Sequence, residues 1–420
     1  MAQDQKRLTA EAQLSSLPVP MGEASWAHDV RARARARLLE AGSPARRDEY
    51  WRNTDPRTLT QPLAPAGPAD ADGTPPDFGT DARLVRFVNG RLREDLSLAP
   101  GAPGLAAQPL GDALKQDITI ARELFGVLET AGQEKVDRPL AILNTATATD
   151  GLVLQATGDA APLHLHYDRI GEGASTLRHV IRVESGASLT ILESGSASNV
   201  VMEIDLAPGA VFHHVRIQSG MHEPTATHIF ARIGGEAALR SFTLTADGTM
   251  TRNEIVLDLV GADASGHVGG AILAENSSHV DNTVFVTHSS VNGESRQVYK
   301  NVLGGKAKAI FQGKIFVREG AQKTDGYQIS QSVLLNDGCE FLAKPELEIY
   351  ADDVACSHGS TTGALDPTAM FYLQSRGVRR AEAEAMLIAA FADEAIEEIE
   401  NDDLADAMRA EVARWMSNRA

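Results

Sequence analysis

The sequence predicts a mainly β core flanked by α-helical N-terminal and C-terminal regions. Short alternating apolar runs recur between about residues 151 and 359, for example at 189–192, 200–206 and 255–260, and small-residue turns separate them. The 36 glycines are typical of many turns, and the aromatic content of 5% requires a core of Val, Ile, Leu and Ala. This loose repetition favours a β-solenoid, in which each turn buries one apolar row against the next, and leaves a β-sandwich as the alternative.

Residues 1–150 are expected to form a mixed, largely helical region. The apolar pattern over residues 8–39 predicts a helix that ends near Gly42 and Pro44. The Pro- and Gly-rich stretch near residues 62–80 has no periodicity, which predicts an exposed linker. A short strand at residues 84–88 and a helix at residues 121–129 are expected to follow.

The predicted β core spans residues 151–363, and residues 364–420 are expected to form a helical C-terminal domain. A short helix begins at Asp366 and Pro367 and stops at Gly377. Two longer helices follow, and the last carries one apolar stripe formed by Leu404, Met408, Val412 and Trp415. The stripe either packs on the chain's own core or serves as a docking surface for a partner.

Charge and hydropathy exclude several classes of protein. The formal net charge of -18 argues against binding to nucleic acid and to anionic membrane surfaces. No window has the apolar length that crosses a bilayer, and no apolar run follows the basic residues near Met1. We therefore expect a cytoplasmic protein without a secretory signal.

Standard catalytic signatures are absent from the sequence. Gly304-Gly305-Lys306 lacks the glycine spacing and the hydroxyl of a phosphate-binding loop. The chain also has no nucleophile elbow and no paired-cysteine zinc spacing. These absences predict a protein that does not hydrolyse ATP by itself.

Cys356 and His358 form the most notable pair of candidate ligands. In an extended segment they lie on one face, where a neighbouring imidazolium can lower the pKa of a thiol. A thiolate and an imidazole are also suitable ligands for iron, but two ligands do not hold a cluster. Either a second chain supplies the remaining ligands, or the pair is structural.

His164 and His166 also share a face, and we interpret them as ordinary surface or core histidines.

Several ordered segments resemble the SufB/SufD family of SUF iron–sulfur cluster assembly proteins. The resemblance covers roughly the last third of the chain, and an N-terminal aromatic-Arg-x-Thr-Asp segment at residues 50–55 adds to it. The segments lie at residues 299–303, 309–315, 321–325, 334–336, 344–349, 352–354, 356–359 and 371–377.

Within that family, the residues resemble the SufD branch more than the SufB branch. SufB proteins usually carry an Ala/Glu-rich segment where residues 356–358 stand and a cysteine where Leu373 stands. This chain has neither feature. A SufB-like paralogue remains an alternative, as does a polysaccharide-active β-helix enzyme, which would need paired carboxylates on one solenoid face.

The resemblance implies a right-handed parallel β-helix and a non-catalytic scaffold of the SufBCD complex. SufB would pair with the chain through the β-helix, and a homodimer is one alternative when SufB is absent. Cys356 and His358 would lie near the nascent cluster at the SufB interface, as potential metal ligands. The SufC ATPase, which binds the ATP, would dock on the C-terminal helices, for which the candidate residues are Phe371, Tyr372, Arg376, Gly377 and Phe391.

The resemblance also bears on cofactors. It implies that no cofactor is bound tightly by this chain alone. A transient iron–sulfur cluster and reduced flavin (FADH2) would belong to the assembled complex.

Overall fold

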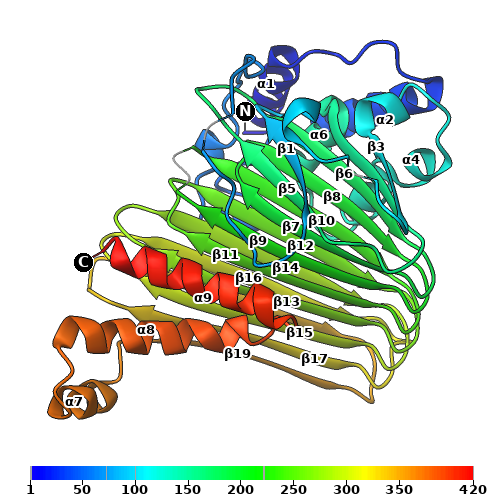
Figure 1. Cartoon of the computed structure of the whole chain (residues 1–420). Helices are drawn as coiled ribbons and strands as arrows, with labels where there is room; N and C mark the ends of the chain where they lie inside the picture. The colour runs from blue at the N-terminus through cyan, green and yellow to red at the C-terminus, as the bar shows by residue number, and fades with distance from the viewer. Residues whose placement is uncertain (1, 72, 100, 221–222, 420) are drawn as a thin grey trace.

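The core is a parallel β-solenoid of two stacked sheets (Figure 1), seen in a computed structural model that describes residues 2–71, 73–99, 101–220 and 223–419. From β4 onward the chain alternates between the sheets, so each strand pairs in parallel with the strand two positions further along. The predicted parallel β-helix core is confirmed, and the β-sandwich alternative is wrong.

The two sheets are called sheet I and sheet II. The strands of sheet I, in chain order, are β3 (Leu105–Pro109), β4 (Asp150–Ala156), β6 (Thr176–Val183), β8 (Asn199–Leu206), β10 (Thr225–Ile233), β12 (Thr251–Leu259), β14 (His279–His288), β16 (Lys308–Val317) and β18 (Glu340–Ile349). Those of sheet II are β1 (Arg83–Val88), β2 (Arg91–Leu92), β5 (Leu163–Asp168), β7 (Ser188–Gly195), β9 (Val211–Ser219), β11 (Ala238–Ala246), β13 (Ser265–Ala274), β15 (Glu294–Leu303), β17 (Asp325–Leu334) and β19 (Ala355–Gly363).

Strand register explains why the sequence repeat has no strict period. In sheet II the in-register series Ala238, Ser265, Glu294, Asp325 and Ala355 advances by 27, 29, 31 and 30 residues. The strands also lengthen, from 8 residues in β6 to 10 in β16. The turns and strands therefore change length along the solenoid while the pairing stays in register.

The main core lies between the sheets, where alternate side chains of each strand meet. Because the strands are in register, apolar residues stack in rows along the solenoid axis. The rows contain mainly Leu, Ile, Val and Ala, and include Leu165, Ile191, Ile204, Leu257 and Val284. The sparse aromatic content is consistent with these thin, regular layers.

Helices of the N-terminal region cover the outer face of sheet I. These helices are α1 (Ala2–Ser16), α2 (Ser25–Ala41), α3 (Leu110–Ala113), α4 (Thr119–Leu124), α5 (Val127–Ala131) and α6 (Pro139–Thr147). Phe125 packs with Val180, Val201 and Phe230 of the sheet. The expected helix at residues 8–39 is two helices, because Pro18 and Pro20 interrupt the pattern.

The aromatic segment at residues 50–54 is a strap across the later strands of sheet I. It overlaps with the short 3₁₀ helix η1 (Glu49–Trp51) and is followed by η2 (Pro56–Thr58). The Arg252 guanidinium lies 3.9 Å from the Trp51 ring centroid, and the Thr54 hydroxyl donates to Asp281. The Tyr50 hydroxyl donates to Glu346 at 2.6 Å. The strap therefore ties the N-terminal region to strands β12, β14 and β18.

The Pro- and Gly-rich stretch at residues 62–80 is irregular, but it is not an exposed linker throughout. The Ala66 amide donates to the Ala174 carbonyl at 2.9 Å. The Phe78 side chain is buried and packs edge-on against His164, with ring centroids 4.9 Å apart. Residue 72 lies outside the described residues. A further 3₁₀ helix, η3 (Glu94–Leu96), follows β2.

The C-terminal helices α8 (Arg380–Ile396) and α9 (Asp402–Ser417) pack on the outer face of sheet II (Figure 1). The apolar stripe Leu404, Met408, Val412 and Trp415 is buried there. Of the two interpretations of this stripe, packing on the chain's own core is correct. In the described part of the chain, no helix has the length and apolar character needed to span a bilayer.

Candidate functional site at the open end of the solenoid

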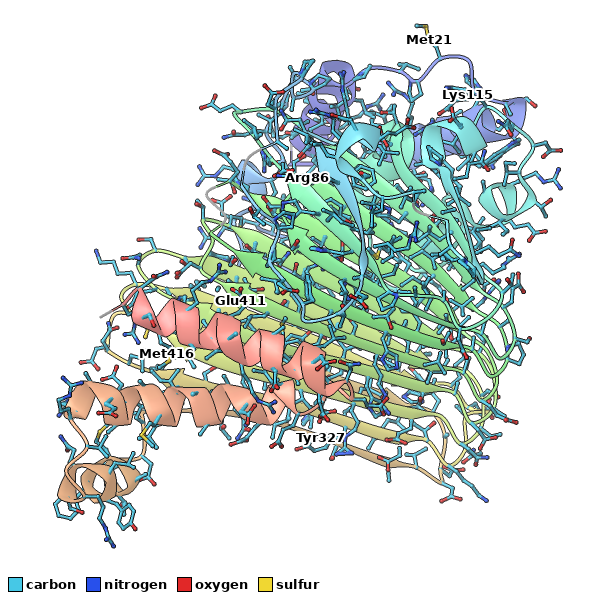
Figure 2. All side chains as sticks on the ribbon, in the orientation of Figure 1. Met21, Arg86, Lys115, Tyr327, Glu411 and Met416 are labelled. Atoms are coloured by element: carbon cyan, nitrogen blue, oxygen red, sulfur yellow. The ribbon has the colours of Figure 1, made fainter. Side chains whose placement is uncertain are left out.

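The C-terminal end of the solenoid exposes the last strand of each sheet. β18 and β19 are the terminal strands there, and each pairs on one side, with β16 and β17. Nearly every residue of β19 is exposed, and Cys356 and Gly359 are only partly buried. Tyr327, labelled in Figure 2, marks the neighbouring strand β17. Two strand edges with unpaired backbone groups are therefore available for pairing with another chain.

Cys356 and His358 lie on the inward face of β19. Cys356 is in register with Gly326, and His358 is in register with Gln328, which is fully buried. Cys356 packs with Ile315 and its apolar neighbours, whereas His358 is exposed because no further rung covers it. The strand thus brings the two side chains to one face, two residues apart, at the mouth of the solenoid interior.

The Cys356 thiol is not activated within this chain. Burial raises its pKa above the ordinary value, and nearby Asp325 acts in the same direction. The backbone hydrogen bond from Gly326 only partly offsets these effects. The sequence led us to expect that an imidazolium would lower the pKa of the thiol, but burial raises it instead. The thiol is therefore protonated at neutral pH.

The described part of the chain does not complete a metal site around this pair. Among the described residues, no group of three or more His, Cys, Asp and Glu side chains is arranged to hold a metal ion. Cys339, the other cysteine, is buried one strand away and its thiol donates to the Asn336 carbonyl at 2.9 Å. Any metal or cluster at Cys356 and His358 would require ligands from elsewhere.

His164 and His166 have a structural role on the outer face of sheet II. Each lies within hydrogen-bonding distance of the Ser194 hydroxyl, at 2.6 and 2.7 Å, and His166 also contacts Asp168 at 3.3 Å. Burial lowers the pKa of His164 to about 4, so its ring is neutral. This arrangement agrees with the interpretation of the pair as ordinary histidines.

Two of the docking candidates, Phe371 and Tyr372, lie on one projecting helix, α7 (Pro367–Ser375), which has no buried residue, and Arg376 and Gly377 follow its end (Figure 1). Phe371 and Tyr372 are 72% and 57% exposed, and the Arg376 guanidinium lies 5.2 Å from the Tyr372 ring centroid. Gly377 follows with a φ of 89° and ends the helix. Phe391 is separate from them, because it lies on α8 beneath the Lys300 ammonium, 4.8 Å from it.

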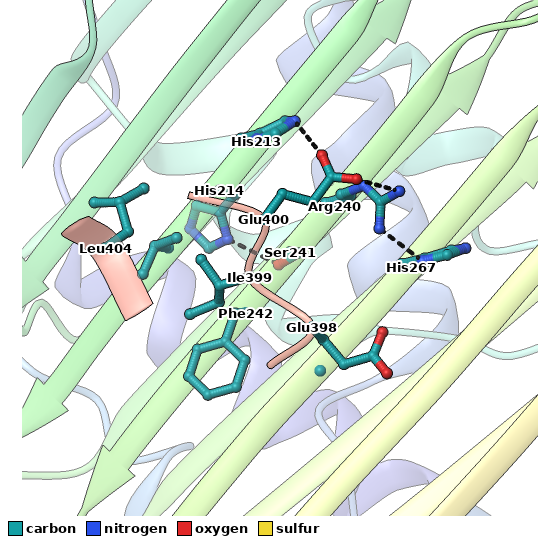
Figure 3. Close-up of a pocket in the computed structure, with 12 residues that line it drawn as sticks. His213, His214, Arg240, Ser241, Phe242, His267, Glu398, Ile399, Glu400 and Leu404 are labelled. Atoms are coloured by element: carbon teal, nitrogen blue, oxygen red, sulfur yellow. Dashed lines mark hydrogen bonds and ion pairs between the residues drawn. The ribbon is translucent and has the colours of Figure 1, made fainter. Parts of the chain in front are cut away.

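A charged cluster that sequence reasoning missed holds the connection between α8 and α9 against sheet II (Figure 3). Arg240 of β11 binds Glu400 at 2.7 Å and lies 3.0 Å from His267 of β13. His213 of β9 lies 3.8 Å from the same Glu400 carboxylate. These three basic residues are in register on neighbouring strands, and only knowledge of the register could have identified the cluster.

Comparisons with known proteins identify what the chain is similar to. Residues 167–391 match the family model described as SUF system FeS cluster assembly, SufBD core domain. The iron-sulfur cluster assembly protein SufD of Escherichia coli is 28% identical, over 91% of this chain and 92% of that protein. An iron-sulfur cluster assembly SufBD family protein of Synechocystis is 28% identical, over 85% of this chain and 84% of its own.

Proposed function

We propose, on the premise that this chain belongs to the SufBD family of iron–sulfur cluster assembly proteins, that it is the SufD-type scaffold subunit of a SufBCD complex. The chain is SufD-like over nearly its full length and has a role in iron–sulfur cluster assembly. The observation that carries the finer proposal is the open last rung, which presents Cys356 and His358 beside two unpaired strand edges.

In this proposal a SufB chain continues the solenoid at β18 and β19. The backbone groups along both free edges would pair with strands of SufB, as edge strands do in β-augmentation. Ile349, the last residue of β18, and Tyr350, which follows it, are 37% and 58% exposed and would be covered by the partner. Cys356 and His358 would then lie at the seam between the two chains.

The seam would provide what the isolated chain lacks for cluster chemistry. The nascent cluster is cargo, and Cys356 and His358 would supply two of its ligands while SufB supplies the others. Because the Cys356 thiol has a raised pKa, it would lose its proton on binding iron or on meeting a cation of the partner. Reduced flavin and the ATP on SufC would belong to the assembled complex in the cytoplasm.

The projecting helix α7 is the proposed docking element for the SufC ATPase. Two exposed aromatic side chains with an adjacent guanidinium are the residue types that dominate binding energy at protein interfaces. Because α8 and α9 are anchored on sheet II, movement of the docked ATPase would be transmitted to the solenoid near its open end.

The test compares the Cys356→Ser, His358→Ala double variant with wild type after co-expression with SufB and SufC. We expect the complex to form with unchanged mass, because His358 is exposed and Cys356 is only partly buried, and cluster formation to fall at least about tenfold. Complex mass is measured by light scattering, and the cluster by its visible absorption and iron content.

Cys339→Ser is the matched control, because it removes the other thiol, which is buried at 8% exposure and donates to backbone carbonyls. It should assemble clusters at the wild-type rate. Normal cluster formation by the double variant would remove Cys356 and His358 from the mechanism.

A further inference from the structure

A cavity of about 150 Å³ lies between helix α5 and the outer face of sheet I. Helix α5 forms one wall, and strands β10, β12 and β14 form the floor. The apolar side chains that line it include Val127, Leu128, Phe230, Val256 and Phe285. Because β16 separates β14 from the terminal strand β18, the cavity does not belong to the open end of the solenoid.

Two phenylalanine rings in the floor are held in place by their neighbours. Phe230 is buried and stacks on the His228 ring, with 6.4 Å between the centroids and 2° between the planes. Phe285 is also buried and meets the Tyr50 ring edge-on at a centroid distance of 5.0 Å. The Arg138 guanidinium lies 4.7 Å from the centroid of Phe285. A floor that is fixed before a ligand arrives reduces the entropy lost on binding.

The volume and the lining of the cavity fit one aromatic ring. An engineered apolar cavity of about 150 Å³ takes a benzene molecule. Phenylalanine rings favour edge-to-face or offset contact with a further ring, and Phe230 and Phe285 are both available for such contact. The floor therefore favours a ligand that carries a single six-membered aromatic ring.

Most of the charged side chains at the mouth of the cavity already have partners. Arg232 donates to Asp205 at 2.8 Å. Arg318 forms an ion pair with Glu134 at 3.3 Å. The Asp258 carboxylate accepts a hydrogen bond from a serine hydroxyl at 2.5 Å. These side chains have little capacity left for the charge of a ligand.

Lys135 is the charged residue of the mouth that has no ionic partner in the described chain. Its side chain is exposed and lines the cavity, and its ammonium lies 4.1 Å from the Phe316 ring centroid. Among the described residues, no carboxylate lies within ion-pair distance of that ammonium. An ammonium at the edge of an apolar cavity attracts an anion, and a carboxylate would receive a charge-assisted hydrogen bond there.

We infer that this cavity is a binding site for a small aromatic carboxylate. The ring lies against Phe230 and Phe285, and the carboxylate accepts a hydrogen bond from Lys135. The site is independent of the proposed function, because neither the strand edges at the open end nor helix α7 contributes to its lining.

The experiment titrates 4-fluorobenzoate into the full chain alone and follows the ¹⁹F NMR signal of the ligand. We expect saturable binding with a Kd of about 1 mM or tighter. The comparison ligands are 4-fluorobenzyl alcohol and 4-fluorobenzylamine, which keep the ring and lose the carboxylate. Both should bind at least about threefold more weakly than the acid, because they do not pair with the ammonium.

Two variants test the two parts of the site. Lys135→Gln should weaken binding of the acid at least about threefold and leave binding of the alcohol unchanged. Val256→Phe fills the cavity and should abolish saturable binding of both. Lys306→Gln is the matched control and should bind the acid as wild type does. Lys306 is exposed in the turn before β16, whereas the cavity lies near the last residues of β12 and β14.

The inference would be overturned if wild type showed no saturable binding of the acid up to about 20 mM, or if it bound the amine more tightly than the acid. Retained binding in Val256→Phe, or equal affinities for the acid in Lys135→Gln and Lys306→Gln, would also overturn it. If Val256→Phe does not fold, the comparison of Lys135→Gln with Lys306→Gln decides alone.

Discussion

At the scale of single residues, the solenoid interior holds a charged cluster near its N-terminal half. The Glu193 carboxylate accepts from the Tyr167 hydroxyl at 2.6 Å and from Arg216 Nε at 2.7 Å, and His214 lies 2.6 Å from it. Burial by itself would raise the pKa of Glu193, but Arg216 and His214 lower it well below its ordinary value. The carboxylate is therefore ionised and depends on its partners.

Replacing Arg216 by methionine should destabilise the protein by about 3–5 kcal/mol, because it leaves a buried carboxylate without its cation. Urea unfolding followed by circular dichroism measures the change. Arg57→Met is the control, since Arg57 forms an ion pair with Asp55 while 86% exposed, and it should change stability little. Equal effects of the two substitutions would contradict the account of the interior cluster.

Buried neutral histidines should make the protein less stable in mild acid. Burial lowers the pKa of His288 to about 4, and its Nε2 lies 2.8 Å from the Ser295 hydroxyl. Between pH 6.5 and 4 the unfolded chain binds a proton that the native chain does not, so stability falls as pH falls. His288→Gln should reduce the loss between pH 7 and 4.5 by about 2–3 kcal/mol.

The measurement is urea unfolding of His288→Gln at a series of pH values. His28→Gln, at an exposed position on α2, should keep the wild-type slope. A slope in His288→Gln that matches wild type would mean that His288 already binds its proton in the native state.

At the scale of elements, the C-terminal helices divide into an anchored pair and a free helix. Ile388 and Ala392 of α8 and Met408 of α9 are buried on sheet II, whereas α7 buries none of its residues. The sequence could locate all three helices from periodicity and stop signals. It could not decide which would be free, because an apolar stripe such as that of α9 looks the same whether it covers a sheet or a partner.

Substituting both aromatic residues of α7, as Phe371→Ala with Tyr372→Ala, should weaken SufC binding at least about tenfold. Both side chains are exposed, so the melting temperature should not change. Calorimetric titration with SufC measures the affinity, and Leu98→Ala, at an apolar position in the N-terminal region that is 56% exposed, is the control. Wild-type affinity in the double variant would move the docking surface away from α7.

At the scale of the whole molecule, the N-terminal strap and the C-terminal helices clamp opposite faces of one solenoid. Tyr50 and Trp51 hold sheet I, and Trp415, whose indole donates to Asp247 at 3.0 Å, holds the other side. The strap contacts Glu346 on the outer face of β18, but the free edges of β18 and β19 stay unpaired in the described chain. The edges of β18 and β19 are therefore free because these strands come last in their sheets, and not only because of the residues that they contain.

The sequence could predict the solenoid, the helical ends and the shared face of Cys356 and His358, because alternation and turn residues are local signals. It could not predict that Gln328 lies beneath His358, since that depends on a register of 30 residues between strands. The sequence also could not predict the raised pKa of Cys356, because the thiol is buried by Ile315, which lies on the opposite sheet.

The most direct test asks whether the open end of the solenoid is the interface with SufB. It measures hydrogen–deuterium exchange of the backbone amides of residues 340–363, with and without SufB. The account predicts that the backbone amides of β18 and β19 become protected in the complex, Cys356 and His358 included, as the free edges pair with the partner. A stable complex in which these amides exchange as fast as in the free chain, with protection elsewhere, would contradict it.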